Sequence, residues 1–264
     1  MDDFTPLLDL AVDVAHEAGA LLLDGLSQVR TAVDTKSTRT DMVSEMDHAS
    51  ERLIAARLRS ARPDDGFLGE EGTSSAGSSG VRWIFDPLDG TTNYLYGLPA
   101  WAVSIAAEVD GEVTAGVVHD PVHGETFTAL RGGGAWCNGE ALRVAGAAEL
   151  ATALVGTGFS YDAVERGRQA ALLARVLPAV RDVRRAGAAA LDLCWVALGR
   201  MDAFYEWGLM PWDFAAGALV ASEAGAVVEV LDDGTHVAAP PHLHGPLVAL
   251  LAAAVDLRDR GPVA

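Results

Sequence analysis

Two aspartates separated by three positions lie in the run WIFDPLDGTTNY, residues 83–94. Apolar residues at the start of the run predict a buried strand, Pro87 blocks continuation of the strand ladder, and a glycine permits a tight turn. In that turn the carboxylates of Asp86 and Asp89 can converge on one point, with the Leu88 carbonyl between them. Oxygen-only ligands of this kind suit a hard cation such as Mg²⁺.

The residues after the two aspartates have the composition of a helix N-terminus. Backbone amides beginning at Gly90 and Thr91 can bind a phosphate there, because unpaired donors and the helix dipole favour an anion. Asp-Pro and Asp-Gly pairs are also common in ordinary turns. A single pair would therefore indicate only a turn, whereas the complete run indicates a site for a cation and an anion together.

Two further segments with acidic residues precede this run. Asp47 follows Ser44 by three residues at the predicted start of a helix, which is also the spacing of a capping box. Glu70 and Glu71 follow the short strand-like segment 67–69. Adjacent carboxylates beside a strand end are usually solvated, but they can also supply metal ligands. Each position thus has both a structural and a chemical interpretation.

A later acidic residue, Asp213, lies in the run WDFAAG near the start of a late predicted helix. A carboxylate there can simply be an N-cap. Its meaning changes if the folded chain brings it to Asp86 and Asp89. Glu206, at the end of a predicted strand, would then lie near the same opening.

The composition excludes several classes of protein. With 264 residues, 50% of them hydrophobic, the chain can bury a large core, and its net charge of −18 repels nucleic acids and anionic membranes. Residues 1–4 lack the pattern of a signal peptide, and the apolar run 246–255 is too short to span a bilayer. Cys137 and Cys194 have no Cys-x-x-Cys spacing, which fits core residues in a reducing cytoplasm, although a disulfide between them stays open.

The spacing of apolar residues predicts two halves of different character. In the first half, helices begin at Thr5 and at Ser44, on either side of a polar loop over residues 31–41, and a largely antiparallel meander follows. Asp110–Gly111 predicts a hairpin within it. The strands are predicted at residues 67–69, 83–85, 102–109, 112–119 and 125–129.

From about residue 150 strands and helices alternate, which is typical of an α/β lobe. Strands are predicted at 153–157, 180–184, 203–205 and 226–230, and helices at 164–177, 188–198 and 214–224. A boundary near residue 148 divides the chain into an N-terminal α+β lobe, 1–148, and a C-terminal α/β lobe, 149–264. The first lobe carries most of the candidate ligands, and the second carries Asp213.

With these residues the chain resembles the inositol monophosphatase family of magnesium-dependent, lithium-sensitive phosphatases. Four segments carry the resemblance, and they occur in the family's order. They are Asp41-x-Val43-Ser44-x-x-Asp47, Gly69-Glu70-Glu71, Asp86 to Asn93, and Trp212-Asp213-x-Ala215-x-Gly217. The resemblance implies a layered αβαβα sandwich of the α/β class, a homodimer, and a small phosphorylated polyol or related metabolite as substrate.

The resemblance also implies a role for each matching residue. Two to three Mg²⁺ ions would be held by Glu70, Asp86, the Leu88 carbonyl, Asp89 and Asp213. The catalytic residues would be Asp47 and Thr91, which orient and activate the attacking water, together with Glu70. Phosphate would be bound by Gly90 and Thr91, the alcohol by Ala189 and Glu206, and the loop that orders a third metal would be supported by Lys36 and Glu71.

Departures from the family pattern are small. Ser44 stands where Thr is frequent and Tyr94 where Phe is frequent, and neither change removes a metal ligand. Arg184 and Arg185 precede a predicted helix on the substrate side. They can select a substrate, form a dimer contact, or make ordinary surface ion pairs of little energetic value.

The predicted reaction is hydrolysis of a phosphate monoester, first of all inositol monophosphate, by direct in-line attack of a water that Mg²⁺ activates. No Ser-His or Cys-His motif in the sequence predicts a covalent route. Histidinol phosphate, fructose 1,6-bisphosphate and 3′-phosphoadenosine phosphates are alternative substrates, because selectivity lies in the variable lobe. A regulatory protein-binding role is the alternative from another class.

Overall fold

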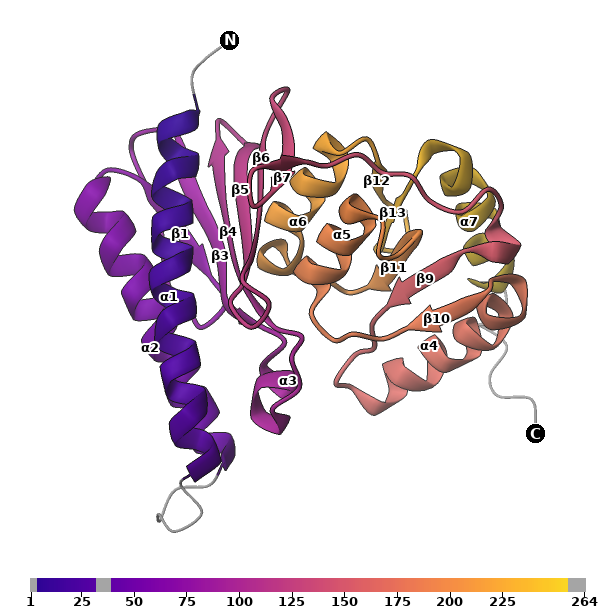
Figure 1. Ribbon diagram of the computed structural model, residues 1–264, viewed down its shortest axis with the longest axis horizontal. Coiled ribbons are helices and arrows are strands. Elements are labelled where there is room, and N and C mark those ends of the chain that lie inside the picture. Colours follow the sequence, from indigo (N-terminus) through magenta and orange to yellow (C-terminus); the bar gives the residue numbers. More distant parts are fainter. Residues whose placement is uncertain (1–3, 32–38, 256–264) are drawn as a thin grey trace.

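The computed structural model describes residues 4–31 and 39–255, except the side chains at 27–31, 39–44 and 254–255. Within these residues five layers lie side by side, in the order helices, sheet, helices, sheet, helices (Figure 1). Each interface between layers has its own cluster of buried apolar side chains. This architecture confirms the layered α/β sandwich expected from the sequence.

Two long helices, α1 (Thr5–Thr31) and α2 (Arg39–Ala61), form the first layer. α1 is the helix predicted from Thr5, and it packs an apolar stripe against the sheet, with Leu7, Ala11, Val14, Ala18 and Leu22 buried. α2 begins before the predicted start at Ser44, so Asp47 lies inside a helix and its interpretation as a capping residue is wrong. Lys36 lies outside the described residues.

The second layer is an eight-stranded sheet in the order β2-β1-β3-β4-β5-β6-β7-β8. Only β1 and β3 are parallel; all other neighbours are antiparallel, as the predicted meander requires. The strands are β1 (Gly66–Gly69), β2 (Ser74–Ser75), β3 (Val81–Asp89), β4 (Ala102–Val109), β5 (Glu112–Asp120), β6 (Glu125–Leu130), β7 (Gly134–Cys137) and β8 (Glu140–Ala141). The predicted hairpin joins β4 to β5, and Asp110 and Gly111 have φ of 52° and 88°, as such a turn requires.

β3 extends further than predicted. Its ladder to β4 pairs Asp86 with Ser104 and, after a register shift, Asp89 with Ala102. Pro87 therefore interrupts the ladder without ending the strand, because a bulge accommodates a residue that lacks an N–H group. The short helix α3 (Thr91–Tyr96) follows directly.

The second sheet belongs to the later part of the chain and has the order β10-β9-β11-β13-β12. Its strands are β9 (Leu154–Thr157), β10 (Asp182–Arg184), β11 (Ala203–Trp207), β12 (Val227–Val230) and β13 (Thr235–Ala239). β10, β9 and β11 are parallel, whereas β13 is antiparallel to both of its neighbours. The hairpin partner β13 was absent from the sequence-based prediction.

Four helices accompany this sheet (Figure 1). α5 (Ala189–Leu198) and α6 (Pro211–Glu223) lie between the two sheets, and α4 (Ala163–Val176) and α7 (Pro241–Val255) cover the outer face. Short 3₁₀ helices occur at Leu150–Thr152 and Leu177–Ala179. α7 was also not predicted as a helix, although its buried Leu243, Leu247 and Leu251 have helical spacing. The division near residue 148 stays a prediction, since α5 and α6 share apolar clusters with both sheets.

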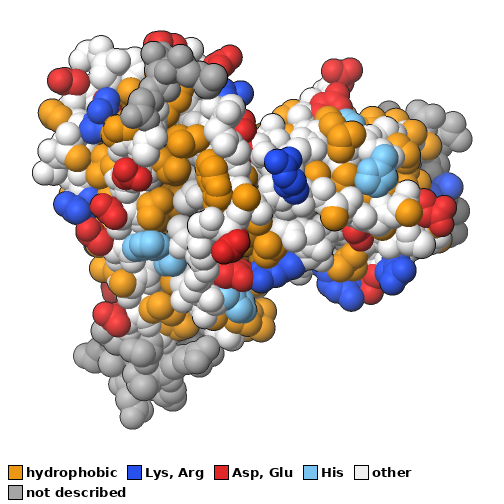
Figure 2. All heavy atoms as spheres, turned by 45° about the horizontal axis from the view of Figure 1, so that its top comes forward, with side chains coloured by type: hydrophobic (Ala, Val, Ile, Leu, Met, Phe, Trp, Pro, Cys, Tyr) orange, Lys and Arg blue, Asp and Glu red, His pale blue; other side chains and the backbone are white. Residues whose placement is uncertain are grey.

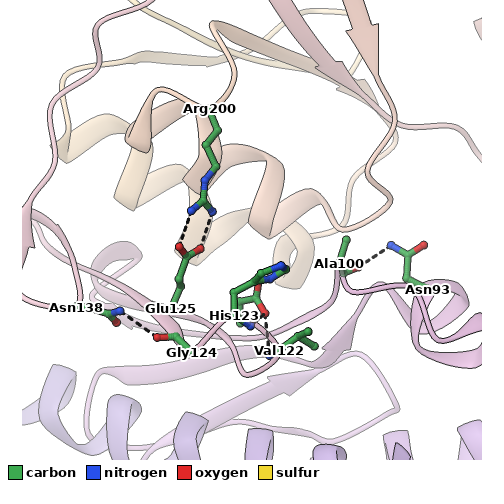
Figure 3. A network of polar contacts seen from close by, with 9 residues as sticks. Asn93, Ala100, Val122, His123, Gly124, Glu125, Asn138 and Arg200 are labelled. Atoms are coloured by element: carbon green, nitrogen blue, oxygen red, sulfur yellow. Dashed lines mark hydrogen bonds and ion pairs between the residues drawn. The ribbon is translucent and has the colours of Figure 1, made fainter.

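Polar contacts hold the two halves of the chain together. After α5, Arg200 Nη1 donates to Glu125 Oε2 of β6 at 2.6 Å (Figure 3). Before α5, the Ala186 carbonyl accepts from Asn93 Nδ2 at 2.8 Å. The segment before α5 is thus attached to α3 and the residue after α5 to the first sheet, which fixes the position of the α5 N-terminus.

Two simpler expectations concern the membrane and the cysteines. No helix within residues 4–31 and 39–255 combines the length and the apolar character needed to cross a bilayer. Cys137 and Cys194 are both free thiols, so the disulfide that the sequence left open does not form here. Cys194 is buried, as expected for a core residue, while Cys137 is only partly buried.

Candidate active site

A cavity of about 560 Å³ lies where the C-terminal ends of β3 and β11 meet the N-termini of α3, α5 and α6. The predicted site residues that line it are Glu70, Asp86, Leu88, Asp89, Gly90, Thr91, Ala189, Glu206 and Asp213. Residues far apart in the sequence thus share one cavity. Helix N-termini favour anions, so this geometry combines acidic side chains with backbone groups that attract a phosphate.

The turn between β3 and α3 is held by its own hydrogen bonds. The Leu88 N–H donates to Asp86 Oδ1 at 2.8 Å, and Thr91 Oγ1 donates to the Leu88 carbonyl at 3.1 Å. Gly90 has φ of 93°, and a Cβ there would lie 2.8 Å from the Ala100 carbonyl oxygen. This turn requires glycine for both reasons, and it presents the two aspartates in a defined orientation.

Two of the acids are bound to the N-termini of the central helices. Asp89 is buried, and its Oδ2 accepts the Ala190 N–H of α5 at 2.8 Å. Asp213 Oδ2 accepts the Met210 N–H at 2.8 Å. Because α6 begins at Pro211, Asp213 lies in its first turn, and the predicted N-cap position is wrong. Both contacts use N–H groups that a helix leaves unpaired.

Asp47 reaches the same region from α2 and is only 3% exposed. Burial, followed by repulsion from Glu71 and Glu70, raises the pKa of Asp47 to about 8, while a hydrogen bond from Thr91 opposes this increase. Within the described residues, Asp47 Oδ1 has no hydrogen-bond partner. The Thr91 hydroxyl has a single proton and two acceptors, Asp47 and the Leu88 carbonyl. A buried carboxyl group of this kind is suited to accept a proton from a bound water.

The pair of glutamates after β1 is held by a buried residue of α2. Glu51 accepts the N–H groups of Glu71 and Thr73, each at 2.8 Å. Burial raises the pKa of Glu70 to about 7. Glu71 does not line the cavity; its Oε2 lies 3.1 Å from His48 Nδ1.

The acidic end of the cavity has the chemistry of a cation site. Burial raises the pKa of Asp86, Asp89 and Asp213, and for Asp86 and Asp89 neighbouring carboxylates add to the increase. A cation relieves both effects, and the donors are all oxygen atoms, as Mg²⁺ prefers. No three His, Cys, Asp or Glu side chains of the described chain already surround one point at ligand distance. The carboxylates would therefore have to close around an ion.

The other end of the cavity contains the predicted alcohol-binding residues, Ala189 and Glu206. Burial raises the pKa of Glu206 to about 7, against the opposing charge of Arg185. A Cβ on Gly158 would overlap the Glu206 carboxylate, so this glycine makes room for the carboxyl group. Tyr161 OH and Thr92 Oγ1 lie 3.1 Å apart at the same opening.

Sequence reasoning assigned no role to Asn93, which the structure shows to be a positioning residue. It is buried, and its Nδ2 donates to the Ala100 carbonyl at 2.6 Å and to the Ala186 carbonyl. Asn93 thereby attaches the loop before α5 to the turn that carries Asp89. Its place at the end of the DGTTN run was the available signal, but a partner 93 residues away is not visible in a sequence.

We expect the metal-free protein to lose stability as the pH rises from about 5 to 8. The folded-state pKa values of Asp47 and Glu70 are raised to about 8 and about 7, so the folded protein keeps protons that the unfolded chain releases near pH ~4. The free energy of unfolding is therefore highest below the unfolded-state pKa. It falls as the pH rises, until both groups are ionised in the folded state as well. Thermal unfolding with a chelator should show a Tm lower by several degrees at pH 8.

The Asp47→Asn variant serves as the control for this decline, since it removes one of the groups responsible. Its Tm should vary less with pH than that of the unaltered protein. A Tm that is constant or rises between pH 5 and 8 in the unaltered protein would contradict the expectation.

Known proteins that are similar to this chain identify its family. Residues 3–257 match the inositol monophosphatase family. The chain is 49% identical to "Inositol-1-monophosphatase" of Mycobacterium leprae, covering 83% of this chain and 81% of that protein, and 44% identical to "Nus factor SuhB" of Pseudomonas aeruginosa, covering 84% of each. The solved structure of "Mycobacterium tuberculosis SuhB" superimposes with a TM-score of 0.85 at 44% identity, covering 96% of this chain and 98% of that one. The chain therefore belongs to the inositol monophosphatase family.

Proposed function

We propose that this protein, a phosphoric monoester hydrolase by its family, cleaves inositol monophosphate to inositol and phosphate in a Mg²⁺-dependent reaction. One observation carries the proposal. The acids Glu70, Asp86, Asp89 and Asp213 share a cavity, and the Asp47–Thr91 pair adjoins them. A site that only stored a cation would have no need for the buried Asp47 beside a hydroxyl group.

The ligands of two to three Mg²⁺ ions would be Glu70, Asp86, the Leu88 carbonyl, Asp89 and Asp213. Bound Mg²⁺ would supply neutralisation of the phosphoryl oxygens and of the departing alkoxide, and a lower pKa for water. The structure supports this set because the four carboxylates line one cavity, Asp86 and Asp89 are buried, and the pKa of each carboxyl group is raised.

The chain's own residues would perform the remaining steps. Asp47 and Thr91 would orient the attacking water, and Asp47, with Glu70 beside it, would take its proton. The backbone N–H groups of Gly90 and Thr91 would donate to the phosphate, which sets the line of attack. Glu206 would accept hydrogen bonds from the alcohol next to Ala189. We keep Glu71 and Lys36 as the proposed support of a third ion.

We further infer a cytoplasmic homodimer without nucleic-acid or membrane partners. On the face shown in Figure 2, Lys and Arg side chains lie singly or in small groups among acidic and apolar ones, with no continuous basic stripe. The net charge of −18 likewise opposes direct contact with nucleic acids. The relative named "Nus factor SuhB" favours a second candidate, a regulatory role through protein contacts.

A panel of phosphate-release assays tests the proposed function. It compares inositol 1-phosphate, histidinol phosphate, fructose 1,6-bisphosphate and 3′-phosphoadenosine 5′-phosphate, each with Mg²⁺, with a chelator, and with Mg²⁺ plus lithium. We expect the highest kcat/KM for inositol 1-phosphate and loss of activity with the chelator. Hydrolysis that is unaffected by chelation would contradict the Mg²⁺ dependence. Absence of activity on all four substrates, with partner binding unchanged in Asp89→Asn, would favour the regulatory role.

A further inference from the structure

The cavity has one cationic lining residue among the described residues, Arg185, against five acids. No hydrogen bond or ion pair joins the Arg185 guanidinium to any described residue, so all of its donors are available to a ligand. The adjacent Arg184 differs, because its Nη1 donates to the exposed Asp182 at 2.6 Å and it does not line the cavity. Of the two arginines noted in the sequence, only Arg185 belongs to the site.

The position of Arg185 is set by the loop before α5. The neighbouring Ala186 carbonyl is bound by Asn93, and a Cβ on Gly187 would overlap the guanidinium group, which therefore lies over the glycine backbone. Gly187 has φ of 96°, which reinforces the need for glycine. The Arg185 side chain is thus directed into the cavity by the loop before α5, whose backbone path Asn93 and Gly187 determine.

The acids that face Arg185 are those of the alcohol end. Its charge lowers the pKa of Glu206 and of the buried Asp192. Its guanidinium lies over Gly187, which together with Ala189 and Glu206 lines the cavity, so Arg185 belongs with the residues proposed to bind the alcohol. At that end it offers donors beside the acceptor oxygens of Glu206.

Resting on the proposed function, we infer that Arg185 is a specificity-determining residue that, together with Glu206, selects a polyhydroxyl alcohol bearing no second charged group. A hydroxyl group both donates and accepts, so neighbouring hydroxyls can donate to Glu206 while accepting from Arg185. The two side chains have opposite charges, which makes this end of the cavity close to neutral. A second phosphate would gain from Arg185 but would be repelled by Glu206 at the same place.

The test measures kcat and KM of Arg185→Gln on inositol 1-phosphate and on 4-nitrophenyl phosphate, whose alcohol carries no free hydroxyl. Loss of a hydrogen bond from a charged donor should lower kcat/KM for inositol 1-phosphate by about 10- to 100-fold, mainly through KM. The loss with 4-nitrophenyl phosphate should be about tenfold smaller. Arg185→Lys should recover part of the lost affinity, because it restores a charge without the planar fork.

Two further variants complete the design. Arg184→Gln is the matched control, and its kcat/KM should stay within about threefold on both esters, since an exposed ion pair contributes little. Glu206→Gln removes the opposing charge, so it should raise the kcat/KM of fructose 1,6-bisphosphate relative to inositol 1-phosphate by about tenfold, and only while Arg185 is present.

The outcomes separate this inference from the proposed function. Equal losses on the two monoesters in Arg185→Gln would show a merely structural role and would overturn the inference alone. A wild-type preference for fructose 1,6-bisphosphate over inositol 1-phosphate would overturn both the inference and the proposed substrate. A wild-type protein that hydrolyses none of these esters with Mg²⁺ would overturn the proposed function, and the inference with it.

Discussion

Asp89→Asn is expected to lower kcat by at least ~100-fold while the protein stays folded, because removing a buried charge that acts on the transition state costs about this much. The substituted amide keeps an oxygen that can still accept the Ala190 N–H, which the carboxylate accepts at 2.8 Å. The charge of the acidic end is lost, and with it part of the proposed support for Mg²⁺. Phosphate release at saturating Mg²⁺, together with thermal unfolding, measures both effects.

Stability should move in the opposite direction from turnover. Burial and Asp213 raise the pKa of Asp89, so ionised Asp89 is unfavourable in the metal-free fold, and the neutral amide should leave Tm unchanged or raise it. Asp65→Asn is a matched control, because this buried carboxylate lies outside the cavity and accepts from Arg62, Ser79 and Trp83. Asp65→Asn should lower Tm, because it weakens these hydrogen bonds, and its turnover should stay within about threefold of that of the unaltered protein. Near-normal Mg²⁺-dependent turnover in Asp89→Asn would refute the assignment.

Asp47→Asn is expected to reduce kcat by about 100-fold or more with little change in KM, since general-base catalysis contributes factors of this order. An amide cannot take a proton, and Asp47 is the buried carboxyl group bound to Thr91. The variant should also lose the increase of kcat with pH that ionisation of Asp47 produces in the unaltered protein. Turnover measured from pH 6 to 9 tests both statements.

The Thr91 hydroxyl gives a second way to test the pair. Thr91→Ser keeps the hydroxyl and should retain most of the activity, whereas Thr91→Val should resemble Asp47→Asn. The double variant Asp47→Asn/Thr91→Val should be little worse than either single one, because residues that act on the same water are not additive. Fully multiplicative losses, or an Asp47→Asn variant of normal kcat, would contradict the proposed pairing.

Local sequence patterns predicted much of the fold because they depend on short-range periodicity. The helix from Thr5 and the hairpin of β4 and β5 around Asp110–Gly111 were confirmed. The errors occurred where tertiary contacts override local signals. Pro87 was expected to end a strand, yet β3 resumes at Asp89 because β4 lies beside it and a bulge absorbs the proline. Asp47 has the spacing of a capping residue, yet α2 begins upstream of it.

The later elements show a related limit. The segment of β13 has no distinctive pattern of its own, and it becomes a strand through its antiparallel neighbours β11 and β12. α7 contains Pro246, which argues against a helix in a local analysis, although its leucines have helical spacing. Packing against the second sheet decides both cases.

The sequence by itself determined the residue types of the site and their order along the chain: Asp47, Glu70, the pair Asp86 and Asp89, Thr91, Glu206 and Asp213. These types suffice to indicate oxygen ligands for a hard cation beside donors for a phosphate. Only the tertiary structure decided which of them share a cavity, because contacts such as that of Asp89 with Ala190 join residues 101 positions apart.

The two arginines show the same division most clearly. Arg184 and Arg185 are chemically identical and adjacent, so no local pattern distinguishes them. The loop attached by Asn93 exposes one to Asp182 and directs the other into the cavity beside Glu206. Which of the two charges faces the cavity is therefore set by the path of the backbone, since side-chain chemistry can act only where the fold places it.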